Sequence, residues 1–185
     1  MKTMKKLFLF IITALAFYQC KSKLPSEQNF KRTIQLTSTY QLCGGMMPSP
    51  EDQLASRTET PLPNYKLYIR SGNQNSLSEN ILIELTTDAS GLAEFELPVG
   101  SYCLVDSQKA NEKQIEEWKK EFKVASKNWD AIEEECLEEW IKEPLLKFEV
   151  YADKEQNKEV LNLNIHRKCF WNAIPCVVYR GPFPS

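Results

Sequence analysis

The residues of this chain that could do chemistry are its six cysteines and its single histidine. His166, Cys169 and Cys176 form the pattern His-x2-Cys-x6-Cys, and Cys43 could add a fourth ligand. Imidazole and thiolate ligands together suit zinc or Cu(I). However, the spacing matches no common zinc motif, and in a strand over 161–165 the next residue, His166, shares a face with polar side chains. We therefore expect an ordinary polar histidine and no cofactor, and keep a metal-handling protein as an alternative function.

Cysteines in an oxidising compartment usually form disulfides. Five cysteines follow Cys20, namely Cys43, Cys103, Cys136, Cys169 and Cys176. If Cys20 carries a lipid, these five form two bridges and leave one thiol; otherwise six are available. The sequence does not determine the pairing, but we predict a bridge between Cys103 and Cys136. Cys103 is expected on the outer face of its strand, and Cys136 on the apolar stripe of a helix that covers this face.

No arrangement typical of an enzyme is present in the sequence. A Ser–His or Cys–His pair would have to use His166, and there is no Gly-x-Ser-x-Gly motif. Gly44-Gly45 lacks the strand, lysine and helix start of a phosphate-binding loop. The acidic run at 133–139 is typical of a solvated helix face. We therefore expect a protein that is not an enzyme.

The first twenty residues have the layout of a secretory signal peptide. Residues 1–6 carry three lysines, residues 7–16 form an apolar segment, and Cys20 follows before polar sequence begins. Ten apolar residues span about 15 Å as a helix, which is half of a bilayer core, so no permanent spanning helix is expected here.

Two cleavage sites are compatible with this segment. An ordinary peptidase would cut after Ala16. Alternatively, the stretch that ends at Cys20 resembles a bacterial lipoprotein signal, in which cleavage precedes a lipidated cysteine, although two of its residues depart from the usual pattern. We expect the second alternative, with residues 1–19 removed and residues 20–30 acting as a flexible tether. The triacylated Cys20 that this resemblance implies would anchor the chain firmly to a membrane.

The remaining chain, residues 31–185, is long enough for one domain with a sizeable core. Removal of residues 1–19 takes away three lysines and no acidic residue, so the net charge changes from −2 to about −5. This balance argues against a nucleic-acid partner, which would require a basic surface.

Most of this domain alternates apolar and polar residues with a period of two, as half-buried strands do. Such segments lie at residues 34–40, 65–69, 81–85, 93–97, 102–104, 146–150 and 161–165, with a last short candidate at 176–179. Short strands separated by Gly and Pro turns predict a β-sandwich.

A helical period interrupts the strands. Residues at about 107–143 place apolar side chains on one stripe of each of two helices, with Asn128 as the expected N-cap of the second and Pro144 closing it. Each stripe must be buried, so we expect this helical insertion to pack on a sheet face. Segment 43–64, rich in Gly and Pro, is expected to be a loop.

Residues 61–105 resemble a known fold family. The strand that ends at Thr87 is followed by the turn Asp88-Ala-Ser-Gly91, a strand centred on Phe95, the turn Pro98-Val-Gly100, and then Tyr102-Cys-Leu104. This order is similar to that of the transthyretin-like and carboxypeptidase-regulatory-like domains. The resemblance implies a mainly β, antiparallel β-sandwich, here with an inserted helical pair. Gly91 would permit the positive φ of a hairpin turn between two of its strands.

These features predict a non-enzymatic envelope lipoprotein with a binding or structural role, similar to lipoproteins of Bacteroidota-type bacteria. We expect it in the outer membrane, facing the periplasm or the cell surface. Its expected partners are the membrane, through the lipid anchor, and a protein or a glycan. A sugar- or peptide-binding surface could use the aromatic residues Tyr68, Phe170, Trp171 and Tyr179. A periplasmic inhibitor or immunity-type protein is a further alternative.

Overall fold

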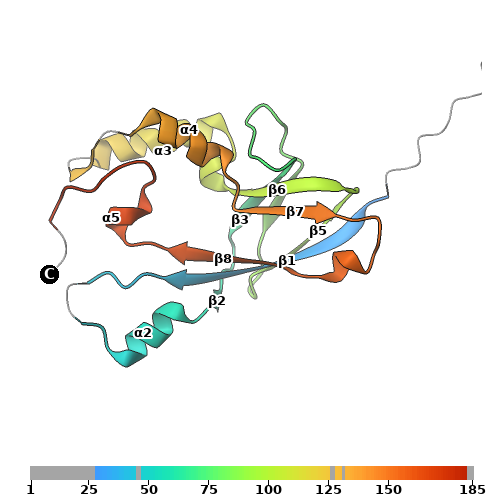
Figure 1. Cartoon of the computed structure of the whole chain (residues 1–185), viewed down its shortest axis with the longest axis horizontal. Coiled ribbons are helices and arrows are strands. Elements are labelled where there is room, and N and C mark those ends of the chain that lie inside the picture. Colours follow the sequence, from blue (N-terminus) through green and yellow to red (C-terminus); the bar gives the residue numbers. More distant parts are fainter. Residues whose placement is uncertain (1–27, 45–46, 126–127, 131, 183–185) are drawn as a thin grey trace, which may run out of the picture.

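The structure is a computed structural model that describes residues 28–44, 47–125, 128–130 and 132–182 (Figure 1). The predicted signal peptide, Cys20 and most of the predicted tether lie outside these residues. In the part that is described, no helix combines the length and the apolar character needed to cross a membrane.

Eight strands form two sheets. The first sheet contains β1 (Phe30–Tyr40), β2 (Thr60–Pro61), β5 (Leu92–Leu97) and β8 (Leu161–Arg167). The second contains β3 (Lys66–Ser71), β4 (Ile83–Thr86), β6 (Gly100–Asp106) and β7 (Leu146–Val150), in the order β4-β3-β6-β7. The helical elements are α2 (Pro50–Arg57), η1 (Ser107–Lys109), α3 (Glu112–Ala125), α4 (Glu134–Lys142), η3 (Gln156–Lys158) and α5 (Phe170–Ala173).

The hydrophobic core lies between the two sheets. Alternate residues of the strands point inward, and the fully buried members include Ile34, Leu36, Leu67, Ile69 and Leu104. Phe148 fills the centre, with its ring centroid 5.7 Å from those of Phe95 and Tyr102. The prediction of a mainly β sandwich is confirmed.

One pairing departs from the expected antiparallel pattern. β1 is antiparallel to β2 and β5 but parallel to β8, with Ile34 opposite Leu161 and Tyr40 opposite Arg167. Parallel neighbours need a long crossover connection. Here the whole domain between β1 and β8 supplies it, so the first and last strands lie side by side.

The turn from Asp88 to Gly91 is present, but the prediction of a hairpin there is wrong. Gly91 N–H donates to the Asp88 carbonyl at 3.0 Å, and the Asp88 carboxylate accepts from two further backbone N–H groups. However, β4 pairs with β3, whereas β5 pairs with β1. The turn therefore carries the chain from one sheet to the other, since both strands pack on one core instead of on each other.

Three local predictions also need correction. The expected loop at 43–64 contains α2, which a capping box between Ser49 and Asp52 starts. The second inserted helix begins at Glu134, not next to Asn128. Tyr179, in the last strand candidate, forms only an isolated bridge with Trp129.

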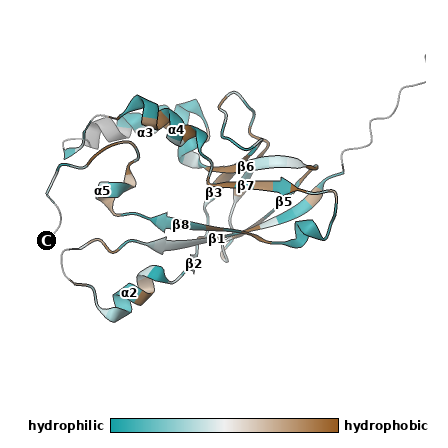
Figure 2. Ribbon diagram, in the orientation of Figure 1, coloured by the Kyte–Doolittle hydropathy of each residue, from teal (hydrophilic) through white to brown (hydrophobic). Residues whose placement is uncertain are grey.

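Helices cover the central strands β3 and β6 on the outer face of the second sheet, so these two strands are buried on both sides, whereas Glu84 of β4 and Lys147 and Glu149 of β7 remain exposed there. Cys103 and Val105 of β6 point away from the core and yet are fully buried. In Figure 1, α3 and α4 lie over this side of the molecule. Figure 2 shows apolar residues interspersed with hydrophilic ones along these helices, as expected for elements with one buried face.

A polar clamp fixes the C-terminal end of α4 to the sheet. The Asn75 backbone N–H donates to the Lys142 carbonyl, and its side-chain amide donates to the Ile141 carbonyl, both at 2.9 Å. Lys109 Nζ donates to the Glu143 carbonyl at 2.7 Å and lies over the Trp140 ring. These carbonyl groups at the helix end have no partner within the helix, so the clamp satisfies them where they are buried.

Replacement of Gly91 tests the crossing between the sheets. A Cβ at this position would lie 2.3 Å from the Leu36 carbonyl oxygen, and its φ is +76°. We expect Gly91→Ala to lower the free energy of unfolding by more than about 2 kcal/mol, measured by urea denaturation. Gly72→Ala is the control, because its φ is +85° but no atom lies within 4 Å of the added Cβ. Equal losses in the two variants would contradict the close backbone approach at Gly91.

The buried Lys109 should make stability depend on pH. Burial lowers the pKa of Lys109 below its ordinary value of 10.5, although Asp106 partly opposes this shift. Between the lowered pKa and 10.5 the unfolded chain binds more protons, so stability rises with pH in this window. Relative to Lys109→Met, the wild type should gain unfolding free energy between about pH 7 and about pH 10.

The control for this measurement is Lys113→Met, because the Lys113 side chain is 85% exposed. It should follow the wild type at both pH values. A pH dependence that Lys109→Met leaves unchanged would show that Lys109 is not the group responsible.

Candidate binding surface

Two disulfides hold the C-terminal segment, residues 168–182, against the rest of the domain. Cys43, which follows β1, is bonded to Cys169, and Cys136 of α4 is bonded to Cys176. Cys103 is a buried free thiol. The expectation of two bridges and one thiol among these five cysteines is confirmed.

The predicted bridge between Cys103 and Cys136 is wrong. The residue that α4 buries most deeply is Leu137, which is 1% exposed, whereas Cys136 is only partly buried and points to the C-terminal segment. Ile132, expected on the same stripe as Cys136, lies before the helix begins, and Leu137 instead sets the buried face, so Cys136 lies at its edge. Cys103 does lie beneath the helical layer, where its thiol faces the Gln74 carbonyl. Burial raises the pKa of Cys103, which keeps the thiol protonated.

The candidate metal ligands do not come together as a metal site. Cys43, Cys169 and Cys176 are all in disulfides, which lack the thiolate charge that zinc or copper would need. His166 Nδ1 lies 3.0 Å from Thr39 Oγ1. Among the described residues, no group of three or more His, Cys, Asp or Glu side chains is placed to hold a metal ion.

The C-terminal segment gathers four aromatic rings, which we call the aromatic end: Trp129, Phe170, Trp171 and Tyr179. Ring centroids of neighbouring members are 4.8 to 5.2 Å apart, in tilted or edge-to-face geometry. Phe170 is 51% exposed, which is unusual for a large apolar side chain in a cluster. Tyr68, the fourth aromatic predicted for a binding surface, is buried beneath the helices and does not take part.

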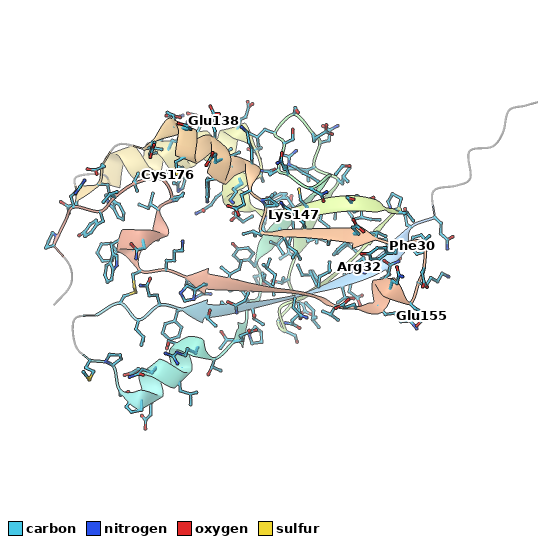
Figure 3. The ribbon with its side chains drawn as sticks, viewed as in Figure 1. Phe30, Arg32, Glu138, Lys147, Glu155 and Cys176 are labelled. Carbon is cyan, nitrogen blue, oxygen red and sulfur yellow. A yellow bond between two sulfur atoms is a disulfide. The ribbon has the colours of Figure 1, made fainter. Side chains whose placement is uncertain are left out.

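Backbone contacts add to the bridges at this end. Asp130 N–H donates to the Val178 carbonyl at 3.0 Å, and Arg180 N–H donates to the Asn128 carbonyl at 2.7 Å. The Arg180 guanidinium also pairs with the Asp130 carboxylate at 3.0 Å, and this contact raises the pKa of Arg180. Figure 3 places Cys176 beside the helices, at the opposite end of the molecule from Phe30 and Arg32.

His166 lies between two shallow hollows next to the aromatic end. One has a volume of about 510 Å³ and is lined by His166, Gln41, Lys168, Trp171 and Asn172, among others. The other, about 500 Å³, also includes His166 and Gln41, together with Arg57. This surface thus places hydrogen-bonding groups and basic side chains near the half-buried Trp171 and the exposed Phe170.

A ladder of polar side chains continues from His166 along the outer face of the first sheet. Thr39 Oγ1 lies 2.9 Å from Asn164 Oδ1 and 3.0 Å from His166 Nδ1. Asn164 Nδ2 donates to Thr37 Oγ1, which in turn donates to Glu59 at 2.8 Å. These contacts fix the rotamers of exposed side chains, so the polar groups are held in place before any ligand binds.

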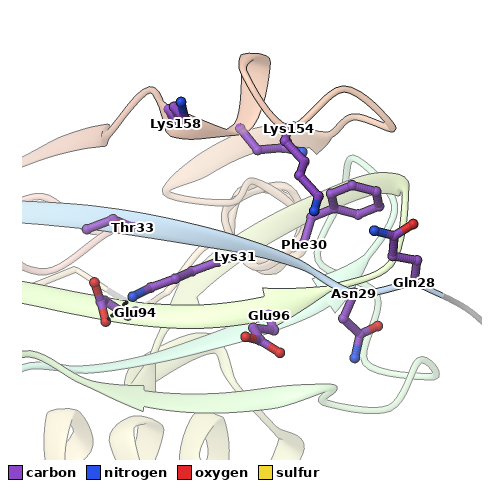
Figure 4. Close-up of a pocket in the computed structure, with 10 residues that line it drawn as sticks. Gln28, Asn29, Phe30, Lys31, Thr33, Glu94, Glu96, Lys154 and Lys158 are labelled. Carbon is purple, nitrogen blue, oxygen red and sulfur yellow. Dashed lines mark ion pairs between the residues drawn. The ribbon is translucent and has the colours of Figure 1, made fainter.

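A third hollow, of about 490 Å³, lies at the other end of the first sheet, near residue 28 (Figure 4). Lys31 pairs there with Glu94 at 2.7 Å, and both side chains are 58% exposed. Lys154 and Lys158 lie on the opposite rim. Exposed ion pairs of this kind contribute little free energy.

Comparison with known proteins supports the fold. The family model for the SpaA prealbumin-like fold domain matches residues 53–135. No curated protein matches the chain. Among solved structures, the Bacillus anthracis TIE protein is similar, with 18% identity and a TM-score of 0.34. The aligned region covers 75% of this chain and 17% of that protein, so this chain spans only a small part of its length. The matched span and the two packed sheets agree on a prealbumin-like β-sandwich.

Proposed function

We propose that this chain is a non-catalytic binding module of the bacterial cell envelope. In this proposal a lipid on Cys20 holds the module at a membrane, and the aromatic end binds a glycan. The observation that carries the proposal is that residues 168–182, which contain little regular structure, are held by both disulfides and bring three aromatic rings together with Trp129.

The two bridges support a binding role because of where they lie. The sandwich core is formed by strands and has no disulfide within it, whereas the bridges fasten residues 168–182 at two points. A segment with so few backbone contacts would otherwise sample many conformations. Cross-links that hold exposed rings in one arrangement reduce the ordering cost of binding.

The place where the chain enters the domain supports the proposed orientation. In Figure 1 the chain enters at the end of β1 that lies opposite α5 and the C-terminal segment. Seven residues lie between Cys20 and residue 28, so the eight residue-to-residue steps span at most about 28 Å of extended chain. An anchor at Cys20 would therefore keep the entry end near the membrane and direct the aromatic end away from it.

The chemistry of the surface favours a glycan. Sugar rings offer C–H faces that pack on aromatic rings and hydroxyl groups that need hydrogen-bond partners. Trp171 and Phe170 supply ring faces, and Gln41, His166 and Asn172 supply donors and acceptors beside them. The hollows are open and shallow, which suits part of an extended polymer better than a small enclosed molecule.

Binding to an array of bacterial surface glycans, followed by calorimetry with the best oligosaccharide, tests this function. We expect Phe170→Ala and Trp171→Ala each to weaken binding at least tenfold, since each removes a ring face. Val99→Ala is the matched control, because Val99 is 55% exposed and lies in the turn between β5 and β6. If the wild type binds no glycan, or if all three variants bind equally, the proposal is wrong.

The anchor is tested separately by the mass of the protein extracted from membranes. We expect a mature chain that begins at Cys20 and carries the added mass of acyl chains. Cys20→Ser should abolish this mass and move the protein to the soluble fraction, whereas Cys103→Ser should leave both unchanged. A soluble wild-type chain that begins at Phe17 would show that cleavage follows Ala16 instead.

A further inference from the structure

One flank of the sandwich has two open sheet edges. β8 is the outer strand of the first sheet and β7 of the second, and no strand in the described ranges pairs with their outer edges. Between them lies a stripe of apolar side chains that pack on the core and remain partly exposed: Leu145, Leu146, Leu161, Leu163 and Ile165. An open edge beside an apolar stripe is a site for strand pairing.

The hydrogen bonds of β8 define which backbone groups are free for such pairing. Gln41 N–H donates to the Arg167 carbonyl at 2.8 Å, so Arg167 directs its backbone groups toward β1. Because these directions alternate along a strand, Asn162, Asn164 and His166 direct their N–H and C=O groups away from β1. β8 contains no proline, lysine or bulge that would block a partner strand.

We propose that a second copy of this chain pairs with β8 in antiparallel fashion, related by a two-fold axis through Leu163. An isologous contact of this kind joins the same surface of both copies and closes after two chains. It would extend the first sheet across the dimer and cover the apolar stripe from both sides.

The charges beside β8 favour this register. With Leu163 on the axis, Leu161 lies opposite Ile165 of the second copy, and Asn162 opposite its Asn164, so side chains of the same kind meet at these positions, while Val160 faces His166. Glu159, extended just before β8, then faces Arg167 of the second copy, and the symmetric pair forms at the other end.

One like-charge pair also results from this register. Lys158 would lie opposite Lys168 of the second copy. However, the chain leaves the strand at η3, and Lys158 is already paired with Glu155 at 2.7 Å. The register thus places an attractive pair at each end of the strand and leaves the repulsion outside it.

Charge exchange tests the dimer and its register together. The full chain is studied by sedimentation velocity over a range of concentrations, in a detergent whose density the buffer matches. We expect the wild type to be dimeric and Glu159→Arg and Arg167→Glu each to weaken self-association at least tenfold, because like charges then face each other. An equimolar mixture of the two variants should recover the dimer, since every facing pair in the mixed dimer is again Arg with Glu.

A backbone variant keeps the proposal falsifiable if a charge variant folds poorly. Asn162→Pro removes an N–H that points to the partner and no hydrogen bond to β1, so it should give a folded monomer by circular dichroism. Asn162→Ala should remain dimeric. A wild type that is monomeric at all concentrations, or charge variants that dimerise as the wild type does, would overturn the proposal. Neither outcome bears on glycan binding or on lipidation at Cys20, which are measured separately.

Discussion

The two central strands of the second sheet, β3 and β6, are buried on both faces, and much of the remaining structure depends on this constraint. One face meets the core through Leu67, Ile69 and Leu104, and the other carries Cys103 and Val105, which are also buried. A sandwich of two sheets would leave that second face in water. The inserted helices therefore form a third layer of the domain, because the sheet needs them to bury this face.

This third layer brings polar groups into the interior. Lys109, Asn75 and Arg70 all lie beneath it, and each donates to backbone carbonyls of the layer or of the segment that leads to it. Burial of such groups is costly unless they are paired. The hydrogen bonds of these three side chains fix the position of the helices on the sheet more strictly than apolar contacts alone would. The bridge from Cys136 to Cys176 then extends from this fixed layer to the aromatic end, so the clamp also supports the candidate binding surface.

Period-two alternation is sufficient to predict the sandwich and every strand except the two-residue β2, because the core side chains of β1, β5 and β7 occupy every second position. The same rule cannot assign a strand to a sheet, so it does not distinguish a hairpin at Asp88–Gly91 from a crossing between the two sheets. Ser49 and Asp52 form the capping box that starts α2, and this signal is present in the sequence. The neighbouring prolines and glycines, however, favour a loop for the same segment.

The disulfide pairing and the candidate surface could be predicted only in part. The alternation of side chains along each strand correctly predicts that Cys103 points away from the core and that His166 lies on a polar face. The partner of Cys136 depends on which face of α4 packs on the sheet: Leu137 is buried there, and the neighbouring Cys136 lies about 100° around the helix, toward Cys176. Phe170 and Trp129 belong to one cluster because both pack on Tyr179. These contacts join distant segments, so no local sequence pattern predicts them.

The parallel pairing of β1 with β8 has a consequence for how the chain is made. The first strand of the domain finds its neighbour only when the last strand is available, and Cys43 and Cys169, which lie beyond the ends of these strands, are 126 residues apart. Long-range pairings of this kind form late, because a large loop must close before they yield any contact. A chain that emerges from its N-terminus therefore cannot complete its first sheet during synthesis. For the envelope protein that we propose, this delay is an advantage, because a translocation channel accepts an unfolded chain and the oxidising compartment beyond it allows both bridges to form.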